Sequence, residues 1–167
     1  MRFYGLALLA SAAVLGACGG GENKTADTTK APPASTANPA TPATPAAGAV
    51  APVAATGATH EIKMIGDDKG YRFEPADITI KSGDAVKFTV VGGGPHNVAF
   101  DPATVPADSK AQLNANMPNE MSELSSPMLM NPNESYTISF GGVKPGVYPF
   151  HCTPHLAMNM KGTITVQ

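Results

Sequence analysis

The sequence predicts one all-β sandwich of about eight short strands, preceded by a long tether that lies outside the fold. Several stretches alternate polar and apolar residues, as half-buried strands do. Glycine, proline and aspartate residues punctuate these stretches every eight to twelve residues, a spacing that favours a sandwich or barrel. Residues 58–167 number about 110, which suits one domain with one hydrophobic core.

Seven stretches of the domain read as strands. In the fourth stretch, Val86, Phe88 and Val90 fall on one face of the strand, and we expect that face to be turned toward the core. The predicted strands are His60–Ile65, Tyr71–Glu74, Asp77–Lys81, Ala85–Val90, Ser135–Phe140, Val147–His151 and Lys161–Val166. Between residues 101 and 130 the pattern is weak, apart from a short helical turn expected over Ser109–Asn116. The methionines of segment 117–130 are interpreted as packing residues, with a soft metal-binding patch as the alternative.

The first residues read as an export signal. Arg2 precedes the apolar run Phe3–Leu15, which is too short to span a bilayer stably. The run ends in Leu-Gly-Ala-Cys, which resembles the bacterial lipoprotein box. That resemblance implies removal of residues 1–17, lipidation of Cys18, and a protein anchored to a membrane of the bacterial cell envelope, facing the periplasm or the cell surface. An ordinary cleavable signal with an incidental cysteine is the alternative.

Residues 18–57 predict a disordered linker rich in alanine, proline and threonine. The part from Ala31 to Pro45 contains no Leu, Ile, Phe or Met, so it cannot bury enough apolar surface to offset the entropy of ordering. Its prolines favour an extended chain of about 3.1 Å per residue. We therefore expect a long leash between the anchor and the domain.

The net charge and the number of cysteines exclude some classes of function and of covalent cross-link. The chain has a formal net charge of −2 and no basic patch, so we expect no binding to nucleic acid. Only one cysteine, Cys152, lies in the predicted domain, which therefore cannot form an internal disulfide. A lone cysteine in an exported domain calls for an explanation. We expect a monomer.

A cluster of metal-binding residue types lies close to the C-terminus. Cys152, His155, Met158 and Met160 supply a thiol, an imidazole and two thioethers within nine residues, and Pro95-His96-Asn97 is the best source of a second imidazole. Two histidines and a cysteine with a weak axial methionine form the ligand signature of an electron-transfer copper site. Structural zinc sites use several Cys or His but not Met, which makes zinc the less favoured metal. The alternative to any metal site is a buried thiol that happens to lie beside a surface histidine.

This pattern resembles the plastocyanin/pseudoazurin family of cupredoxins over residues 58–167. The C-x-x-H-x-x-x-x-M spacing and the strand Lys161–Val166 behind it are similar to the family's copper loop. The resemblance implies a Greek-key cupredoxin sandwich that holds one copper ion through His96, Cys152, His155 and Met160. A shorter amicyanin-like loop would select Met158 instead, but the strand begins directly after Met160. Asn97 is expected to bond across to the Cys152 loop and hold it still.

The resemblance also implies a function in one-electron transfer, by Cu(II)/Cu(I) cycling between periplasmic or membrane redox partners. By family analogy the edge of His155 is the electron port, within an apolar surface that includes Pro95, Pro154, Leu156 and Met158. Copper storage or delivery in the cell envelope is the alternative. We do not expect an enzyme, because a multicopper enzyme needs more histidines and only His60 and His151 remain. Strand alternation predicts that His151 faces away from the metal.

Overall fold

The computed structural model of the protein describes residues 50–167. Most of the regular elements in this part of the chain are strands, as predicted, and they are accompanied by one α-helix and one short 3₁₀ helix. The elements are β1 (Thr59–Asp67), β2 (Gly70–Glu74), β3 (Asp77–Ile80), β4 (Ala85–Gly92), β5 (Ala99–Phe100), α1 (Ala107–Ala115), β6 (Ser135–Ser139), β7 (Gly146–His151), η1 (Thr153–Met158) and β8 (Lys161–Val166).

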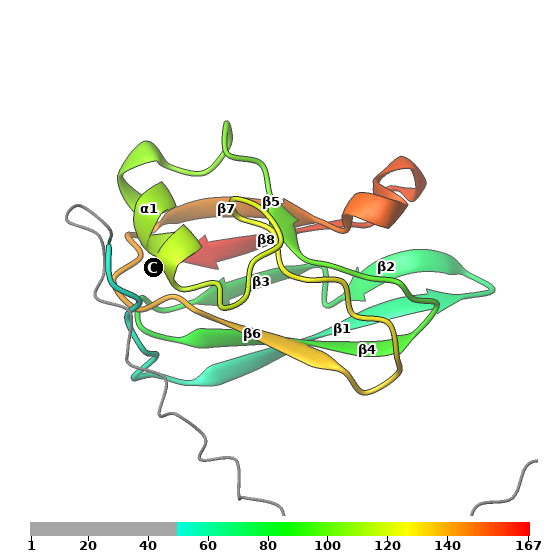
Figure 1. The fold of residues 1–167 in the computed structure, drawn as a ribbon. Coiled ribbons are helices and arrows are strands. Elements are labelled where there is room, and N and C mark those ends of the chain that lie inside the picture. The colour runs from blue at the N-terminus through cyan, green and yellow to red at the C-terminus, as the bar shows by residue number, and fades with distance from the viewer. Residues whose placement is uncertain (1–49) are drawn as a thin grey trace, which may run out of the picture. The chain divides into compact units, whose positions relative to one another are not determined.

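The eight strands build two four-stranded sheets that face each other (Figure 1). One sheet has the order β2-β1-β4-β6 and the other β3-β8-β7-β5. Each mixes directions, because β1 pairs with β4 and β3 with β8 in parallel, whereas the remaining pairs are antiparallel. The predicted all-β sandwich of about eight strands is therefore confirmed.

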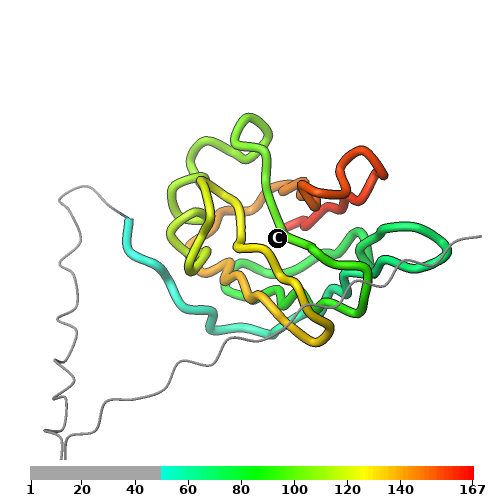
Figure 2. The backbone as a smooth tube through the Cα atoms, turned by 45° about the vertical axis from the view of Figure 1, so that its right-hand side comes forward, coloured from blue at the N-terminus to red at the C-terminus, as the bar shows by residue number. Residues whose placement is uncertain are grey.

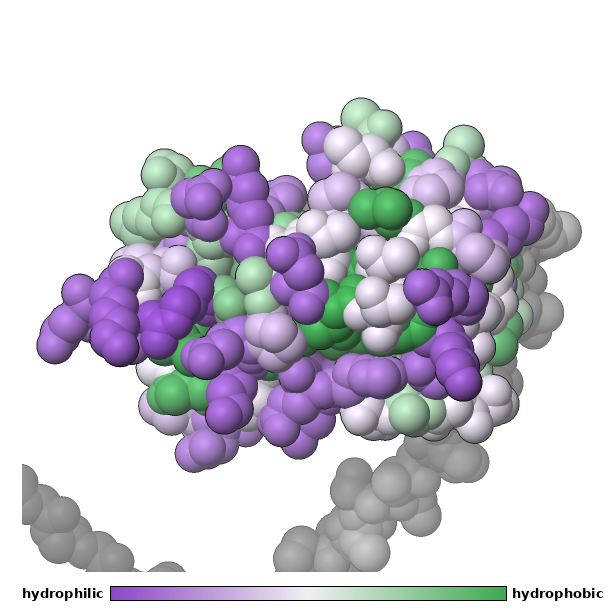
Figure 3. Space-filling model, turned by 180° about the vertical axis from the view of Figure 1, so that it is seen from behind, coloured by the Kyte–Doolittle hydropathy of each residue, from purple (hydrophilic) through white to green (hydrophobic). Residues whose placement is uncertain are grey.

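Aromatic side chains fill the space between the sheets. Phe88 of β4 is fully buried and meets Phe73 and Phe150 edge to face, with ring centroids 6.1 and 5.4 Å away. Val86 and Val90, on the same face of β4, are buried as the alternation predicts. On the face shown in Figure 3, hydrophilic side chains cover much of the outer surface, with apolar residues between them. The sandwich thus has one core, enclosed by both sheets.

The structure adds detail where the sequence pattern is weak. The two-residue strand β5 was not predicted, and α1 lies over the segment where a helical turn was expected. Of the methionines in segment 117–130, Met117 is buried in the core, whereas Met121 and Met130 are exposed. The packing interpretation therefore applies to Met117 and not to Met121 and Met130.

Residues 50–57 lie against the domain, although the predicted linker extends to residue 57. The Val53 amide donates to the Asn116 side chain at 2.8 Å, and the amides of Thr56 and Gly57 both donate to the Gly83 carbonyl at 2.9 Å. Each bond satisfies a backbone donor, so this segment gains partners that a solvated linker lacks. The rest of the predicted linker, the export signal and Cys18 fall outside the described residues. None of the helices within residues 50–167 is long and apolar enough to cross a membrane.

The two ends of the sandwich differ in what they carry. Residues 50–57 and α1 lie at one end, whereas η1 and the β1–β2 hairpin lie at the other, in both Figure 1 and Figure 2. The end that carries η1 therefore also carries His155.

Candidate metal centre

A closed loop between β7 and β8 presents three of the four predicted ligands. Strands β7 and β8 pair as far as His151 and Lys161, and Cys152 follows directly. The Cys152 amide donates to the Met160 carbonyl at 3.0 Å, and the Met160 amide donates to the His155 carbonyl at 3.2 Å. Asn159 reverses the chain between η1 and β8 with a φ of 62°, a left-handed conformation that asparagine tolerates. These bonds bring Cys152, His155 and Met160 together at one end of the sheet.

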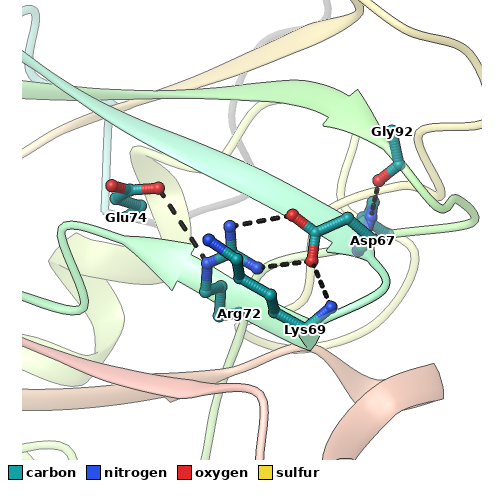
Figure 4. Close-up of polar contacts among 6 residues, drawn as sticks. Asp67, Lys69, Arg72, Glu74 and Gly92 are labelled. Atoms are coloured by element: carbon teal, nitrogen blue, oxygen red, sulfur yellow. Dashed lines mark hydrogen bonds and ion pairs between the residues drawn. The ribbon is translucent and has the colours of Figure 1, made fainter.

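The fourth predicted ligand, His96, comes from the segment between β4 and β5. Its backbone is paired with Leu129 by two hydrogen bonds, of 3.0 and 2.8 Å. Its ring Nε2 lies 2.9 Å from the carbonyl oxygen of Gly92 (Gly92 is labelled in Figure 4). Because a carbonyl only accepts, Nε2 carries the proton, and the Nδ1 of a neutral ring is left with a free lone pair. This contact therefore sets both the tautomer and the orientation of the ring.

The structure brings His96, Cys152 and His155 into one buried cluster. One candidate ligand atom from each lies within 4.8 Å of the others. The Cys152 Sγ is 3.7 Å from Nδ1 of His96 and 3.4 Å from Nδ1 of His155. Both Nδ1 atoms thus face the sulfur, and one thiolate with two imidazole nitrogens is a donor set that copper favours. The residues present fit one copper ion.

Burial distinguishes the two candidate thioethers. Met160 is 0% exposed and belongs to the core that also contains Cys152, whereas Met158 is 55% exposed on η1. The bond between the Cys152 amide and the Met160 carbonyl ties Met160 directly to the cysteine. The geometry therefore favours Met160 over Met158 as a fourth donor to a buried metal.

Burial also shifts the proton affinities of the candidate ligands. It raises the pKa of the Cys152 thiol, an effect that backbone hydrogen bonds from Asn97 and His155 partly oppose. Burial, followed by the neighbouring His96, lowers the pKa of His155. At neutral pH the imidazole of His155 is thus held neutral, as a metal ligand must be. A metal would have to displace the thiol proton, so binding is coupled to proton release.

Asn97 links the His96 segment to the Cys152 loop. Its Oδ1 accepts the Thr153 amide at 2.7 Å, and its Nδ2 donates to the hydroxyls of Thr153 and Ser125, both at 3.2 Å. The Asn97 side chain is fully buried. The two bonds to Thr153 join segments 56 residues apart in sequence and limit their relative movement.

The residues predicted for an electron-transfer surface lie around this cluster. Pro154, Leu156 and Met158 are exposed on η1, and Pro95 is half-buried next to His96. The His155 side chain retains 6% exposure beneath them. The exposed Met130 was not predicted for this surface, although its carbonyl oxygen lies close to Gly94.

Two other histidines lie apart from the cluster. His151 lines a surface groove with Asp101 and Lys161, consistent with a side chain that faces away from Cys152. Burial lowers the pKa of His151. His60 is half-buried, and its Nε2 lies 2.9 Å from Asp84 Oδ2.

Sequence reasoning missed Tyr71, whose ring stacks on His155 with centroids 3.7 Å apart and planes 16° from parallel. Tyr71 belongs to β2, some eighty residues before the loop that it covers. Its only sequence signal is an aromatic residue directly after a hairpin glycine, which does not indicate what the ring contacts.

Comparisons with known proteins agree with this geometry. Residues 60–167 match the family model described as copper binding proteins of the plastocyanin/azurin family. Plastocyanin from Dryopteris crassirhizoma is 41% identical over 105 residues, which cover 62% of this chain and 96% of the relative. Chloroplastic plastocyanin from Physcomitrium patens is 40% identical, and the match spans 63% of this chain but 56% of that relative's length.

Among solved structures, the oxidized plastocyanin of Dryopteris crassirhizoma is 36% identical, with a TM-score of 0.49, and covers 65% of this chain and all of its own. The family model matches well over half of the chain, and the chain covers nearly the whole Dryopteris sequence. The chain therefore belongs to the plastocyanin/azurin family of copper-binding proteins, whose members carry electrons rather than catalyse a reaction.

Proposed function

We propose that the protein is a one-electron carrier with a single type 1 copper site, held by His96, Cys152, His155 and Met160. The observation that carries the proposal is the buried meeting of one sulfur and two imidazole nitrogens within 4.8 Å, with Met160 buried in the same core as Cys152. Copper bound there would supply the Cu(II)/Cu(I) couple. Thiolate and thioether suit Cu(I), and imidazole suits both oxidation states.

The protein's contribution is to hold its ligands in place before and after the electron moves. The Gly92 carbonyl fixes one imidazole, and Asn97 ties the two ligand-bearing segments together. Both ligand histidines and the cysteine are buried, so little water surrounds them. A rigid site that changes little between two charge states favours fast transfer, because few groups have to reorient.

The test is a visible and EPR titration of the purified protein with Cu(II). We expect intense thiolate-to-copper absorption and narrow copper hyperfine splitting, at one copper per chain. The Cys152→Ser variant should lose the intense absorption because it lacks the thiolate. A colourless protein, or a Cys152→Ser variant that keeps the colour, would refute the ligand assignment.

A storage or delivery protein remains a second candidate, because Met121, Met130 and Met158 expose thioethers that could assist transfer of Cu(I). The two functions differ in how tightly the protein retains copper. An electron carrier holds copper tightly in both oxidation states, whereas a delivery protein prefers Cu(I) and exchanges it readily. Competition with chelators specific for each oxidation state separates them.

For the electron carrier, we propose a docking face for redox proteins formed by Pro95, Pro154, Leu156 and Met158. Leu156 and Met158 are exposed apolar side chains on the loop that carries His155. A small apolar face suits weak, transient contacts of the kind used by redox partners. Leu156→Glu should slow electron exchange with a partner protein but leave the visible spectrum unchanged.

We also propose an exported, monomeric protein anchored to a membrane of the cell envelope through lipid on Cys18. Support comes from the export signal pattern and from the position of residues 50–57, at the end of the sandwich remote from η1 (Figure 1). A tether that leaves from that end keeps the proposed docking face clear. Cys18→Ser should release the protein from the membrane fraction, and retention there would contradict the anchor.

A further inference from the structure

We propose that Tyr71 is a positioning residue that holds the imidazole of His155 in its ligating orientation by stacking on its face. The inference rests on the proposed copper function, in which His155 is a ligand. It concerns this chain's own side chains, and its first consequence is visible without any metal.

The two candidate imidazoles are fixed in different ways. The His96 ring has contacts at both nitrogens, because its Nε2 bonds to the Gly92 carbonyl at 2.9 Å and its Nδ1 lies 3.7 Å from Cys152 Sγ, so the ring is held from two sides. In residues 50–167, the only hydrogen-bonding contact of the His155 ring is with Cys152 Sγ, at 3.4 Å from Nδ1. A single contact at one ring atom leaves rotation about that contact open. The ring of His155 therefore needs another constraint.

Tyr71 supplies that constraint. Its ring lies 3.7 Å from the His155 ring, centroid to centroid, at 16° between the planes, which is van der Waals contact across a whole face. His96 packs against His155 from another direction, at 4.9 Å and 61°. The loop residues beside His155 are exposed, yet His155 itself is only 6% exposed. Its ring is thus clamped between aromatic neighbours rather than held by hydrogen bonds.

A glycine in the β1–β2 hairpin leaves room for the Tyr71 ring. Gly66 faces Tyr71 in the β1–β2 register, and a Cβ on Gly66 would lie 2.7 Å from Tyr71 Cε1 and 2.8 Å from Gly93 Cα. Real Cβ atoms essentially never come that close, so a side chain at Gly66 would displace the ring or the His96 segment. The absence of a side chain therefore lets the ring lie across β1, close to both ligand-bearing segments.

Charged groups brace the hairpin next to Tyr71 (Figure 4). The guanidinium of Arg72 donates to both carboxylate oxygens of Asp67, at 2.8 and 3.0 Å, and the Lys69 amide donates to the same carboxylate at 2.9 Å. These hydrogen bonds, Arg72 first, lower the pKa of Asp67 to about 2, so the pair stays charged at neutral pH. A two-point ion pair has a defined geometry, which restricts the turn that carries Tyr71.

The test uses Tyr71→Leu, which removes the ring, and Tyr71→Phe, which keeps the stack and removes only the hydroxyl. NMR relaxation of the histidine rings in the metal-free protein is the first readout, with His60, whose Nε2 lies 2.9 Å from Asp84 Oδ2, as the internal control. We expect faster motion of the His155 ring in the leucine variant, with His60 unchanged, and parental behaviour in the phenylalanine variant. Aromatic pairs of this kind imply about two- to tenfold faster loss of copper to a chelator in the leucine variant.

Three results would overturn the proposal: an equally ordered His155 ring in the leucine variant, an unchanged rate of copper loss, or a phenylalanine variant as impaired as the leucine variant. If Tyr71→Leu does not fold, as judged by circular dichroism, Tyr71→Met takes its place, because methionine fills irregular gaps. Failure of the copper function itself would appear as a parent protein without intense absorption. The metal-free ring measurement would then still report on the stack.

Discussion

Removal of the Asn97 side chain should lower the free energy of unfolding, although Asn97 is not itself a proposed metal ligand. Asn97→Ala deletes three hydrogen bonds, two to Thr153 and one to Ser125, and the amide that makes them is fully buried. Each buried bond contributes about 0.5–1.5 kcal/mol, and a donor left unpaired costs more. Because Thr153 can still reach solvent, we expect a loss of about 2–3 kcal/mol in the free energy of unfolding. That is roughly 30- to 150-fold in the unfolding equilibrium constant.

Urea unfolding of the metal-free protein measures this loss, because bound copper would add its own stabilisation by mass action. The urea concentration at the midpoint of unfolding should fall, while the slope of the unfolding free energy against urea concentration stays the same. Asn131→Ala is the matched control. Its amide is exposed and donates to Glu134, so we expect a change within about 0.5 kcal/mol. A loss below about 1 kcal/mol in Asn97→Ala would refute the reasoning, because the bonds would then contribute no more than surface contacts.

Three further predictions concern the axial ligand, acid stability and the core. Met160→Gln should keep a coloured site but lower its reduction potential, whereas Met158→Gln should leave the potential unchanged; voltammetry that shows the reverse would select Met158. Hydrogen bonds, led by the Lys81 amide, lower the pKa of Asp84, so it stabilises the fold above its unfolded pKa and this contribution is lost as pH falls through the folded value. Asp84→Asn should therefore flatten the acid-side decline of the urea midpoint, and an unchanged slope would contradict this. Phe88→Ala should cost about 3–5 kcal/mol in urea unfolding, because it empties the space between the sheets; a loss under about 1 kcal/mol would mean that the core collapses around it.

Much of this protein could be predicted from its sequence, because the decisive signals are local. Alternation along Ala85–Val90 indicates a strand with one buried face, since neighbouring side chains on a strand point to opposite sides. Cys152, His155 and Met160 lie within nine residues, so any closed loop brings them near one another. Together with the lone cysteine and the Pro-His-Asn segment, this spacing predicts a copper site.

Other features depend on contacts between segments that are distant in sequence, which no local pattern encodes. For the axial thioether the sequence already favours Met160, because a strand begins directly after it, and the structure adds that Met160 is buried in the core whereas Met158 is exposed. Tyr71 has no local signal of this kind, because only the packing of the β1–β2 hairpin against η1 decides that its ring covers His155. In short strands and loops, contacts between segments that are distant in sequence determine which side chains are buried and which have a fixed orientation.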